Sequence, residues 1–265
     1  MVLRLARSTV LVASVAVGAT LGMPSAASAQ HATGFLTRGE FYMLWARTAA
    51  DDPRFDHQGR FNLDADLADY GSGRLILEAD YEAFLGGERR TFDLNQGTYR
   101  FELDFTRRTQ AAEIGAFFAH ASRHVVDREN PDAISWNVFG VRGRRKWDFE
   151  DGASVNARFE LGRAWEQAFV DYEWISQARA TLRHPLAPHK HVSLLLEGSG
   201  VLIWTDPSLY GRERTCGGRV EGGIRFEGRR GAIEIFTAYE RRIDGYPLEL
   251  NRVRMWSLGF RVLNR

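Results

Sequence analysis

The pattern that decides the fold lies in residues 75–83, which read Leu75-Ile76-Leu77-Glu78-Ala79-Asp80-Tyr81-Glu82-Ala83. The odd positions of this stretch are apolar, and the carboxylates of Glu78, Asp80 and Glu82 lie between them. Because successive side chains of a β-strand point to opposite faces, the alternation predicts a strand with one apolar and one charged face.

The same alternation recurs along the chain, and helical periodicity is nearly absent. Two-faced strands are indicated at 61–67, 99–105, 155–161 and 170–174, where Val170, Tyr172 and Trp174 would face away from Asp171 and Glu173. We therefore predict an all-β, antiparallel fold of twelve strands, at 33–46, 59–69, 72–85, 97–107, 110–124, 134–147, 153–163, 168–183, 190–203, 214–227, 230–242 and 250–263.

The links between these strands tend to alternate in length, as they do in outer-membrane barrels. Short links fall at 70–71, 108–109, 148–152, 184–189 and 228–229, and longer ones at 48–58, 86–96, 125–133, 206–213 and 244–249. The link near 163–167 is short where a long one is expected.

The first residues form an export signal. Arg4 and Arg7 precede an uncharged, small-residue stretch at 11–23, and Ala27-Ser28-Ala29 is a cleavage motif. The apolar run is shorter than the roughly 20 residues that a membrane-spanning helix needs. We predict a signal peptide at 1–29, cleavage after Ala29 and one barrel domain at 30–265.

Composition narrows the class of protein. The net charge of +1 lacks the basic excess of a nucleic-acid-binding protein, and the single cysteine, Cys216, cannot form an internal disulfide. No segment after the signal approaches about 18 uninterrupted apolar residues, which excludes a helical membrane protein but not a barrel.

Periodicity alone does not say which face of the strands points inward. In a soluble β-sandwich, lipocalin-like barrel or jelly roll the apolar face would be inside. The membrane alternative is favoured because nearly every strand alternates, and because aromatic residues fall near predicted strand ends, at Trp45, Tyr99, Phe105, Trp136, Trp147, Trp165, Trp174, Trp204 and Trp256. The stretch 256–262 also resembles the C-terminal strand of outer-membrane proteins, although the chain continues with Leu263-Asn264-Arg265.

We therefore expect a transmembrane β-barrel in the outer membrane of a Gram-negative-type bacterium. Its expected partners are outer-membrane lipid and lipopolysaccharide, the barrel-assembly machinery and other envelope proteins, with no nucleic acid and no cofactor. The charged faces would then line the interior, at Asp64, Asp66, Glu78, Asp80, Glu82, Arg100, Glu102, Asp104, Arg158, Glu160, Asp171, Glu173, Arg179, Arg183, Arg219, Glu221 and Arg225.

Two interpretations of this charged interior remain open. Opposed acidic and basic walls could create a transverse field that admits small polar solutes, or the charges could pair across a narrow bore and fill it. The basic run Arg142-Gly143-Arg144-Arg145-Lys146 is interpreted as a solvated strand end, with contact to anionic phosphates as the alternative.

A polar cluster interrupts the pattern at His120, Ser122 and His124, with Asp127 following. The two histidine Cα atoms would lie about 13 Å apart on one strand face, too far to share a metal ion. Ser122 beside a histidine could be a nucleophile with its base; otherwise the cluster is polar lining at the outer rim of the interior. We assign no metal site, and the default expectation is a protein without catalytic activity.

This cluster carries a resemblance to a known family. His120-x-Ser122-x-His124-x-x-Asp127, preceded by Phe117-Phe118, resembles the H-x-S-S-H-x-G-D-E segment of a bacterial family of outer-membrane proteins of unknown function. It departs from that segment at Arg123, Val126 and Arg128. The resemblance implies the barrel and the compartment, and no activity.

Three functions follow as hypotheses. The first is a narrow channel or ligand-binding barrel. The second is a structural component of an envelope complex for secretion, polysaccharide export or motility. The third is a lipid-acting hydrolase that uses Ser122 and a flanking histidine.

Overall fold

The computed structural model describes residues 33–87, 92–125, 134–186, 189–246 and 249–264. These residues form twelve strands and one short helix. The elements are β1 (Gly34–Ala50), β2 (His57–Asp69), β3 (Arg74–Gly86), β4 (Asp93–Arg108), β5 (Glu113–Val125), β6 (Ile134–Asp148), β7 (Ser154–Ala168), β8 (Tyr172–Leu186), β9 (His189–Thr205), α1 (Pro207–Tyr210), β10 (Arg214–Glu227), β11 (Gly231–Arg242) and β12 (Val253–Asn264). The predicted signal peptide and Asp127 lie outside the described residues.

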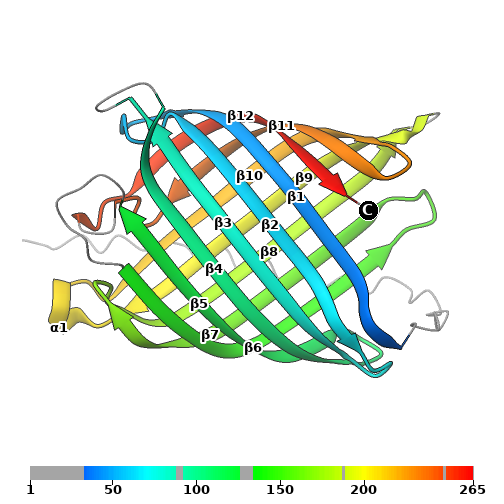
Figure 1. The fold of residues 1–265 in the computed structure, drawn as a ribbon, viewed down its shortest axis with the longest axis horizontal. Helices are drawn as coiled ribbons and strands as arrows, with labels where there is room; N and C mark the ends of the chain where they lie inside the picture. The colour runs from blue at the N-terminus through cyan, green and yellow to red at the C-terminus, as the bar shows by residue number, and fades with distance from the viewer. Residues whose placement is uncertain (1–32, 88–91, 126–133, 187–188, 247–248, 265) are drawn as a thin grey trace, which may run out of the picture.

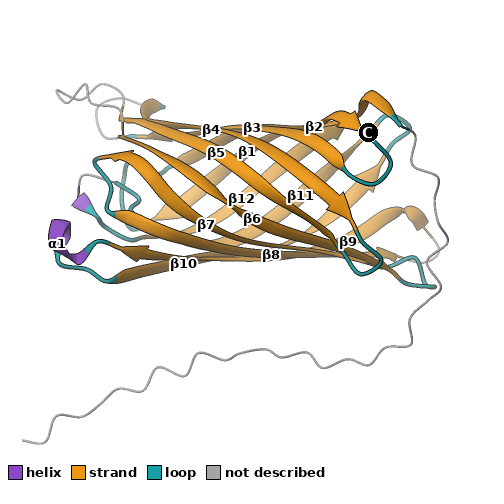
Figure 2. Ribbon diagram, turned by 90° about the horizontal axis from the view of Figure 1, so that it is seen from below, coloured by secondary structure: helices purple, strands orange, loops and turns teal. Residues whose placement is uncertain are grey.

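The strands close into a single barrel. Each strand pairs antiparallel with the next along the chain, and β12 returns to β1, where Tyr42 lies opposite Leu263 and Ala50 opposite Met255. The strands run obliquely around the barrel (Figures 1 and 2). The predicted twelve-strand antiparallel barrel is confirmed. No helix in the described part of the chain is long and apolar enough to cross a membrane.

The two ends of the barrel differ. Gly34 and Asn264 lie at the end that carries the short turns 70–73, 109–112 and 228–230, because they pair with Asp69 and Gly231. The opposite end carries the link with α1 (Figure 1). We call them the short-turn end and the long-link end; in outer-membrane barrels the short turns face the periplasm.

Strand β7 differs most from its predicted bounds. It continues to Ala168 instead of ending near 163, and only 169–171 link it to β8. A register shift between Trp136 and Asn137 accommodates the extra residue Glu166, whose backbone has a φ of 47°. The bulge thus extends the strand where the sequence indicated a link.

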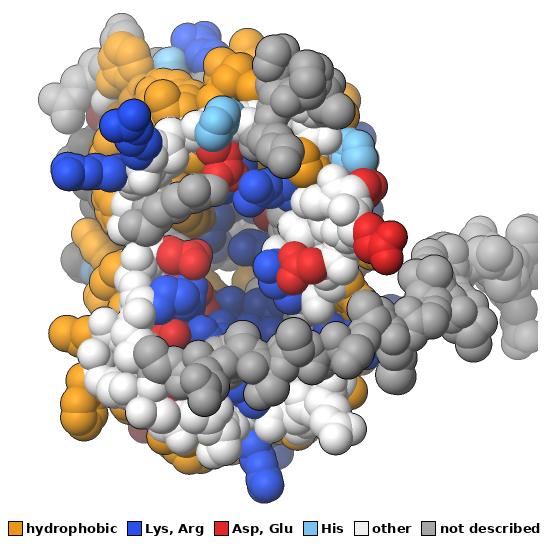
Figure 3. All heavy atoms as spheres, turned by 90° about the vertical axis from the view of Figure 1, so that its right-hand side faces the viewer, with side chains coloured by type: hydrophobic (Ala, Val, Ile, Leu, Met, Phe, Trp, Pro, Cys, Tyr) orange, Lys and Arg blue, Asp and Glu red, His pale blue; other side chains and the backbone are white. Residues whose placement is uncertain are grey.

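The apolar faces of the strands form the outer wall. Phe101, Phe139 and Leu258, from three separate strands, are 52%, 61% and 66% exposed. Their neighbours Glu102 and Asp104 point inward and are buried. Figure 3 looks in from the short-turn end and shows acidic and basic side chains around a central hollow. The barrel therefore has the inside-out distribution that a membrane requires.

Two aromatic residues predicted to face lipid lie inside instead. Trp136 is buried, and so is Tyr172, whose hydroxyl donates to Asp244 Oδ2 at 2.8 Å. The prediction that Tyr172 and Trp174 share a face is wrong, because a register shift separates them: Tyr172 pairs with Thr205, and Trp174 with Trp204. The extra residue, Glu173, is exposed at this strand end.

Candidate functional site

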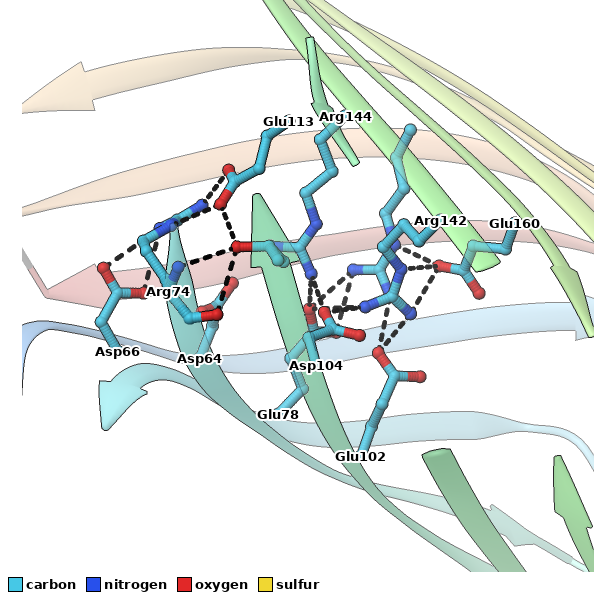
Figure 4. A network of polar contacts seen from close by, with 12 residues as sticks. Asp64, Asp66, Arg74, Glu78, Glu102, Asp104, Glu113, Arg142, Arg144 and Glu160 are labelled. Atoms are coloured by element: carbon cyan, nitrogen blue, oxygen red, sulfur yellow. Dashed lines mark hydrogen bonds and ion pairs between the residues drawn. The ribbon is translucent and has the colours of Figure 1, made fainter. Parts of the chain in front are cut away.

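The first candidate region is the interior. Arg142 on β6 is almost fully buried and forms ion pairs with Glu102 and Asp104, and its Nη2 lies 2.9 Å from Glu160 Oε1. These residues project inward from β4, β6 and β7 and meet in the bore (Figure 4). The interpretation of the basic run as a solvated strand end is therefore wrong for Arg142.

Two further arginines complete this network. Arg144 Nη2 lies 2.6 Å from Asp104 Oδ2 and also pairs with Glu78, while Arg158 Nη1 lies 2.8 Å from Glu78 Oε1. Oxygens of Glu78, Glu102 and Asp104 lie within 4.8 Å of one another, a spacing that could hold a metal ion. In this structure arginine guanidinium groups occupy that position. We call Glu78, Glu102, Asp104, Arg142, Arg144, Arg158 and Glu160 the inner ion-pair cluster.

A second network lines β10 to β12. Arg261 Nη2 lies 3.0 Å from Glu221 Oε1, and Arg219 Nη2 lies 2.8 Å from Glu221 Oε2. Arg225 Nη1 is 2.8 Å from Glu234 Oε1. The charges therefore pair within the barrel at close range on both sides of the bore.

A cavity of about 450 Å³ remains in the interior. Its lining on β8 to β10 includes the short side chain of Ser199 together with the longer side chains of Gln177, Arg179 and Arg219. Towards the long-link end the lining includes Trp136, Ile175 and Ile203, which belong to one buried apolar cluster. Charged residues, among them Arg123 and the Glu82–Arg242 ion pair, line the cavity at the same end.

The predicted interior residues fall into four groups. Those that line the cavity are Asp64, Glu78, Asp80, Glu82, Arg100, Arg158, Glu160, Arg179 and Arg219. Those in ion pairs within the wall are Asp66, Glu102, Asp104, Arg183, Glu221 and Arg225. Asp171 is buried in the link before β8, where it binds Arg212. Glu173 is exposed beside the register shift.

The link between β11 and β12 closes part of the long-link end. Asp244 is 1% exposed, and its carboxylate accepts from Arg212 Nη1 at 2.7 Å as well as from Tyr172. Arg212 also donates to Asp171 at 2.5 Å. Hydrogen bonds with Asp171 and Asp244 raise the pKa of Arg212, so this contact persists at any physiological pH. We call Asp171, Arg212, Tyr172 and Asp244 the mouth latch.

The second candidate region lies on the outer wall. In β5 the buried residues are Phe117, Ala119, Ala121 and Arg123, so His120, Ser122 and His124 point the other way, to the outside. The expectation that they line the interior rim is therefore wrong. A cluster of two histidines and a serine interrupts a wall that is otherwise largely apolar.

This outer cluster is internally hydrogen-bonded. Ser122 Oγ lies 3.1 Å from His124 Nε2, although the two residues are on one strand. His120 Nδ1 lies 2.8 Å from Oδ1 of Asn137, its partner on β6. Asn137 in turn donates to Glu166 Oε2 at 3.0 Å, so the β7 bulge reaches the same cluster. We call His120, Ser122, His124 and Asn137 the outer-wall cluster.

Asn137 and Arg123 were not singled out from the sequence. Asn137 follows Trp136 in a strand whose alternation continues normally, so only the pairing of β5 with β6 places it beside His120. Arg123 stood out only as a departure from a family segment. For Asn137 a signal was present, because a polar side chain on an apolar strand face is unusual in this pattern. For Arg123 there was none, because arginines occupy many inward positions of this barrel.

Solved structures with a similar fold are outer-membrane barrels. Outer membrane phospholipase A from Escherichia coli matches with a TM-score of 0.51 and 11% identity over 84% of this chain and 92% of that chain. The outer membrane phospholipase of Salmonella typhi gives 0.51 and 11%, over 84% and 90%. The translocator domain of autotransporter NalP from Neisseria meningitidis gives 0.44 and 10%, over 86% and 88%.

No model of a known protein family matches the chain, and no curated protein matches it. The resemblance of the His120–Asp127 segment to an outer-membrane family therefore has no support from family models. The solved structures support the barrel fold. The apolar outer wall indicates that the barrel is surrounded by lipid. Together they show that the protein has the fold of bacterial outer-membrane β-barrels, with an outer wall suited to a lipid bilayer.

Proposed function

We propose that the barrel is a hydrolase that cleaves acyl esters of membrane lipids at its outer wall. The observation that carries this proposal is the hydrogen bond between Ser122 Oγ and His124 Nε2, at 3.1 Å, on the face turned towards lipid. A serine within hydrogen-bond reach of an imidazole is the arrangement that activates a hydroxyl nucleophile. The likeness to the phospholipase barrels concerns the fold alone, so the proposal rests on this chain's residues.

The position of Ser122 suits a lipid ester. Ser122 lies three residues before the end of β5 at Val125, on the long-link side. At about 3.3 Å per residue, this places it about 10 Å along the strand from the barrel rim. Because the strands run obliquely, the depth along the barrel axis is less than this distance. Ser122 would then lie near the boundary of head groups and hydrocarbon, where the ester bonds of lipids lie.

The reaction has two balanced steps. Ser122 Oγ attacks the ester carbonyl, its proton passes to His124 Nε2, and the same proton leaves with the alcohol of the broken ester bond. Water then attacks the acyl-serine carbonyl and gives a proton to the imidazole, and the imidazole returns that proton to Ser122 Oγ as the fatty acid leaves. The net reaction consumes one ester and one water.

The neighbouring pair His120 and Asn137 supports this site. Asn137 Oδ1, at 2.8 Å, orients the His120 ring by accepting from Nδ1, which leaves Nε2 as the free acceptor. His120 lies two residues from Ser122 on the same strand face. It therefore adds a second imidazole of fixed orientation beside the nucleophile, whereas His124 is the imidazole hydrogen-bonded to Ser122.

Hydrolysis by the purified barrel tests this proposal. We expect the wild type to release fatty acid from phosphatidylethanolamine vesicles or from lipopolysaccharide. Ser122→Ala should lower the rate by about a thousandfold or more. Ser135→Ala is the matched control, because Ser135 is the cross-strand partner of Ser122, and its rate should stay within about twofold.

A second readout does not depend on the choice of lipid. A fluorophosphonate probe should label Ser122 covalently in the folded barrel and should not label the Ser122→Ala variant. Absence of both hydrolysis and labelling in the wild type would overturn the proposal.

A second candidate function is a narrow passage for small solutes. It is favoured by the cavity of about 450 Å³, which carries both acidic and basic groups along its lining. Single-channel recording of the purified barrel tests it, and small, discrete conductance steps are expected. A bilayer that stays insulating after insertion would overturn this candidate.

A further inference from the structure

Arg123 differs from the other arginines of the interior. It points inward from β5 and is only 8% exposed. Its Nε donates to Thr98 Oγ1 at 3.1 Å, and its Nη1 donates to the backbone oxygen of Asp244 at 2.9 Å. The guanidinium also lies 5.8 Å from the centre of the Trp136 ring. All these partners are neutral groups.

No carboxylate of the described residues forms an ion pair with Arg123. The acidic groups that act on it from further away are Glu82 and Asp244. Glu82 is already paired with Arg242, and the Asp244 carboxylate with Arg212. A buried cation without a counter-charge is costly, and the cost is relieved when an anion binds it.

Arg123 lines the interior cavity together with an apolar surface. Trp136, Ile175 and Ile203 belong to one buried cluster and line the same cavity. The volume of about 450 Å³ lies within the range of small-molecule sites. The cavity thus presents the Arg123 guanidinium, which has neutral hydrogen-bond partners, beside the apolar side chains of Trp136, Ile175 and Ile203.

We propose that the cavity binds a small amphipathic carboxylate, with its carboxylate on Arg123 and its apolar part against Trp136, Ile175 and Ile203. A guanidinium matches the planar geometry of a carboxylate and gives two parallel hydrogen bonds. One unpaired cation fits a monoanion better than a phosphate dianion, which would leave a charge uncompensated. The site is separate from the outer-wall cluster, so it does not depend on hydrolysis.

The ligand enters from the short-turn end. Figure 3 shows the interior hollowed from this side, with charged side chains around the opening. At the opposite end the mouth latch holds Asp244 against Arg123 and Tyr172. The carboxylate would therefore approach from the periplasmic side and stop below the latch.

Calorimetric titration of the full-length barrel in lipid nanodiscs tests this site, with hexanoate as the probe and hexanamide as its neutral analogue. The wild type should bind hexanoate saturably and bind hexanamide at least about tenfold more weakly. Arg123→Gln should weaken hexanoate binding by about tenfold or more and leave hexanamide unchanged. Arg123→Lys should recover part of the affinity, because it restores the charge.

The matched control is Arg179→Gln, which removes another arginine of the same cavity lining and should change hexanoate binding by less than about twofold. Heat-modifiability on gels reports whether each variant is folded, and Arg123→Lys provides the comparison if Arg123→Gln does not fold. Equal affinity for hexanoate and hexanamide, or unchanged binding in Arg123→Gln, would overturn the proposal.

Discussion

The strands on the two sides of the interior share the same alternation of apolar and polar residues. The two sides differ in how completely their charged side chains are buried and paired. In the half formed by β2 to β7, the Arg142 side chain is 1% exposed and forms ion pairs with all four carboxylates of the inner ion-pair cluster. In the half formed by β8 to β10, Arg179 is 49% exposed and has one carboxylate, Glu197, at 3.6 Å. We call them the filled half and the open half.

The difference arises from the residues around these arginines. In the filled half, long charged side chains on adjacent inward positions reach one another and exclude solvent. In the open half, Ser199 occupies the inward position between Arg179 and Arg219, and its short side chain leaves space next to the bore. Side-chain length on a few inward positions therefore decides where a small barrel is packed and where it is hollow.

The largest expected effect is in the filled half. Arg142→Met should lower the free energy of unfolding by about 3–5 kcal/mol, because Glu102, Asp104 and Glu160 would lose their shared buried cation. This change in the free energy of unfolding can be measured by urea titration of the barrel in lipid vesicles, with tryptophan fluorescence as the signal. A loss below about 1 kcal/mol would mean that the cluster is hydrated and the half is not filled.

The mouth latch closes the open half at its long-link end, and its removal should have an intermediate effect. Arg212→Gln leaves Asp171 and Asp244 buried with fewer donors, and we expect a loss of about 1–3 kcal/mol. Faster hydrogen exchange at residues 243–246 would report the local opening. The control is Arg214→Gln at a neighbouring exposed residue, and its hydrogen exchange should match that of the wild type. Equal exchange rates at 243–246 in the two variants would contradict the role of Arg212 in closing this end.

A smaller effect is expected from the arginine of the open half itself. Arg179→Met should change the free energy of unfolding by less than about 1 kcal/mol, because its ion pair is half-exposed and screened by water. The same urea titration compares it directly with Arg142→Met. Similar losses for the two substitutions would remove the distinction between the halves.

The smallest effect on stability is expected from filling the open half. Ser199→Phe should change the unfolding free energy by about 0.5 kcal/mol or less, because the added ring enters existing space. It should also lower any single-channel conductance. Ser257→Phe, at a buried inward position on β12, should cost about 1–3 kcal/mol by overpacking. Equal losses would show that the open half is packed as tightly as β12.

Much of the fold could be predicted from the alternation. All twelve strands were predicted because most of them alternate apolar and polar residues. The charges on the second face of these strands favoured a barrel with a polar interior. The errors cluster where a bulge shifts the alternation by one residue, at Glu166 and Glu173. A bulge depends on the partner strand, so one strand's sequence does not reveal it.

The candidate sites, like the fold, could be predicted from the sequence only in part. The sequence identified Ser122 between two histidines, but its assignment to the interior was wrong. The neighbours Ala121 and Arg123 decide the face, and an inward arginine without a partner cannot be distinguished by pattern from an outward one. Asn137 is 17 positions beyond His120 in the sequence. Only the register between β5 and β6 brings their side chains within hydrogen-bond distance.

The sequence by itself determined two-faced strands, because the period of two fixes which residues share a face of each strand. Only the tertiary structure decided which charges meet, which half of the bore stays open and which side chains face lipid beside Ser122. Those properties depend on the register between strands and on side-chain reach across the bore, and neither is encoded in the period of a single strand.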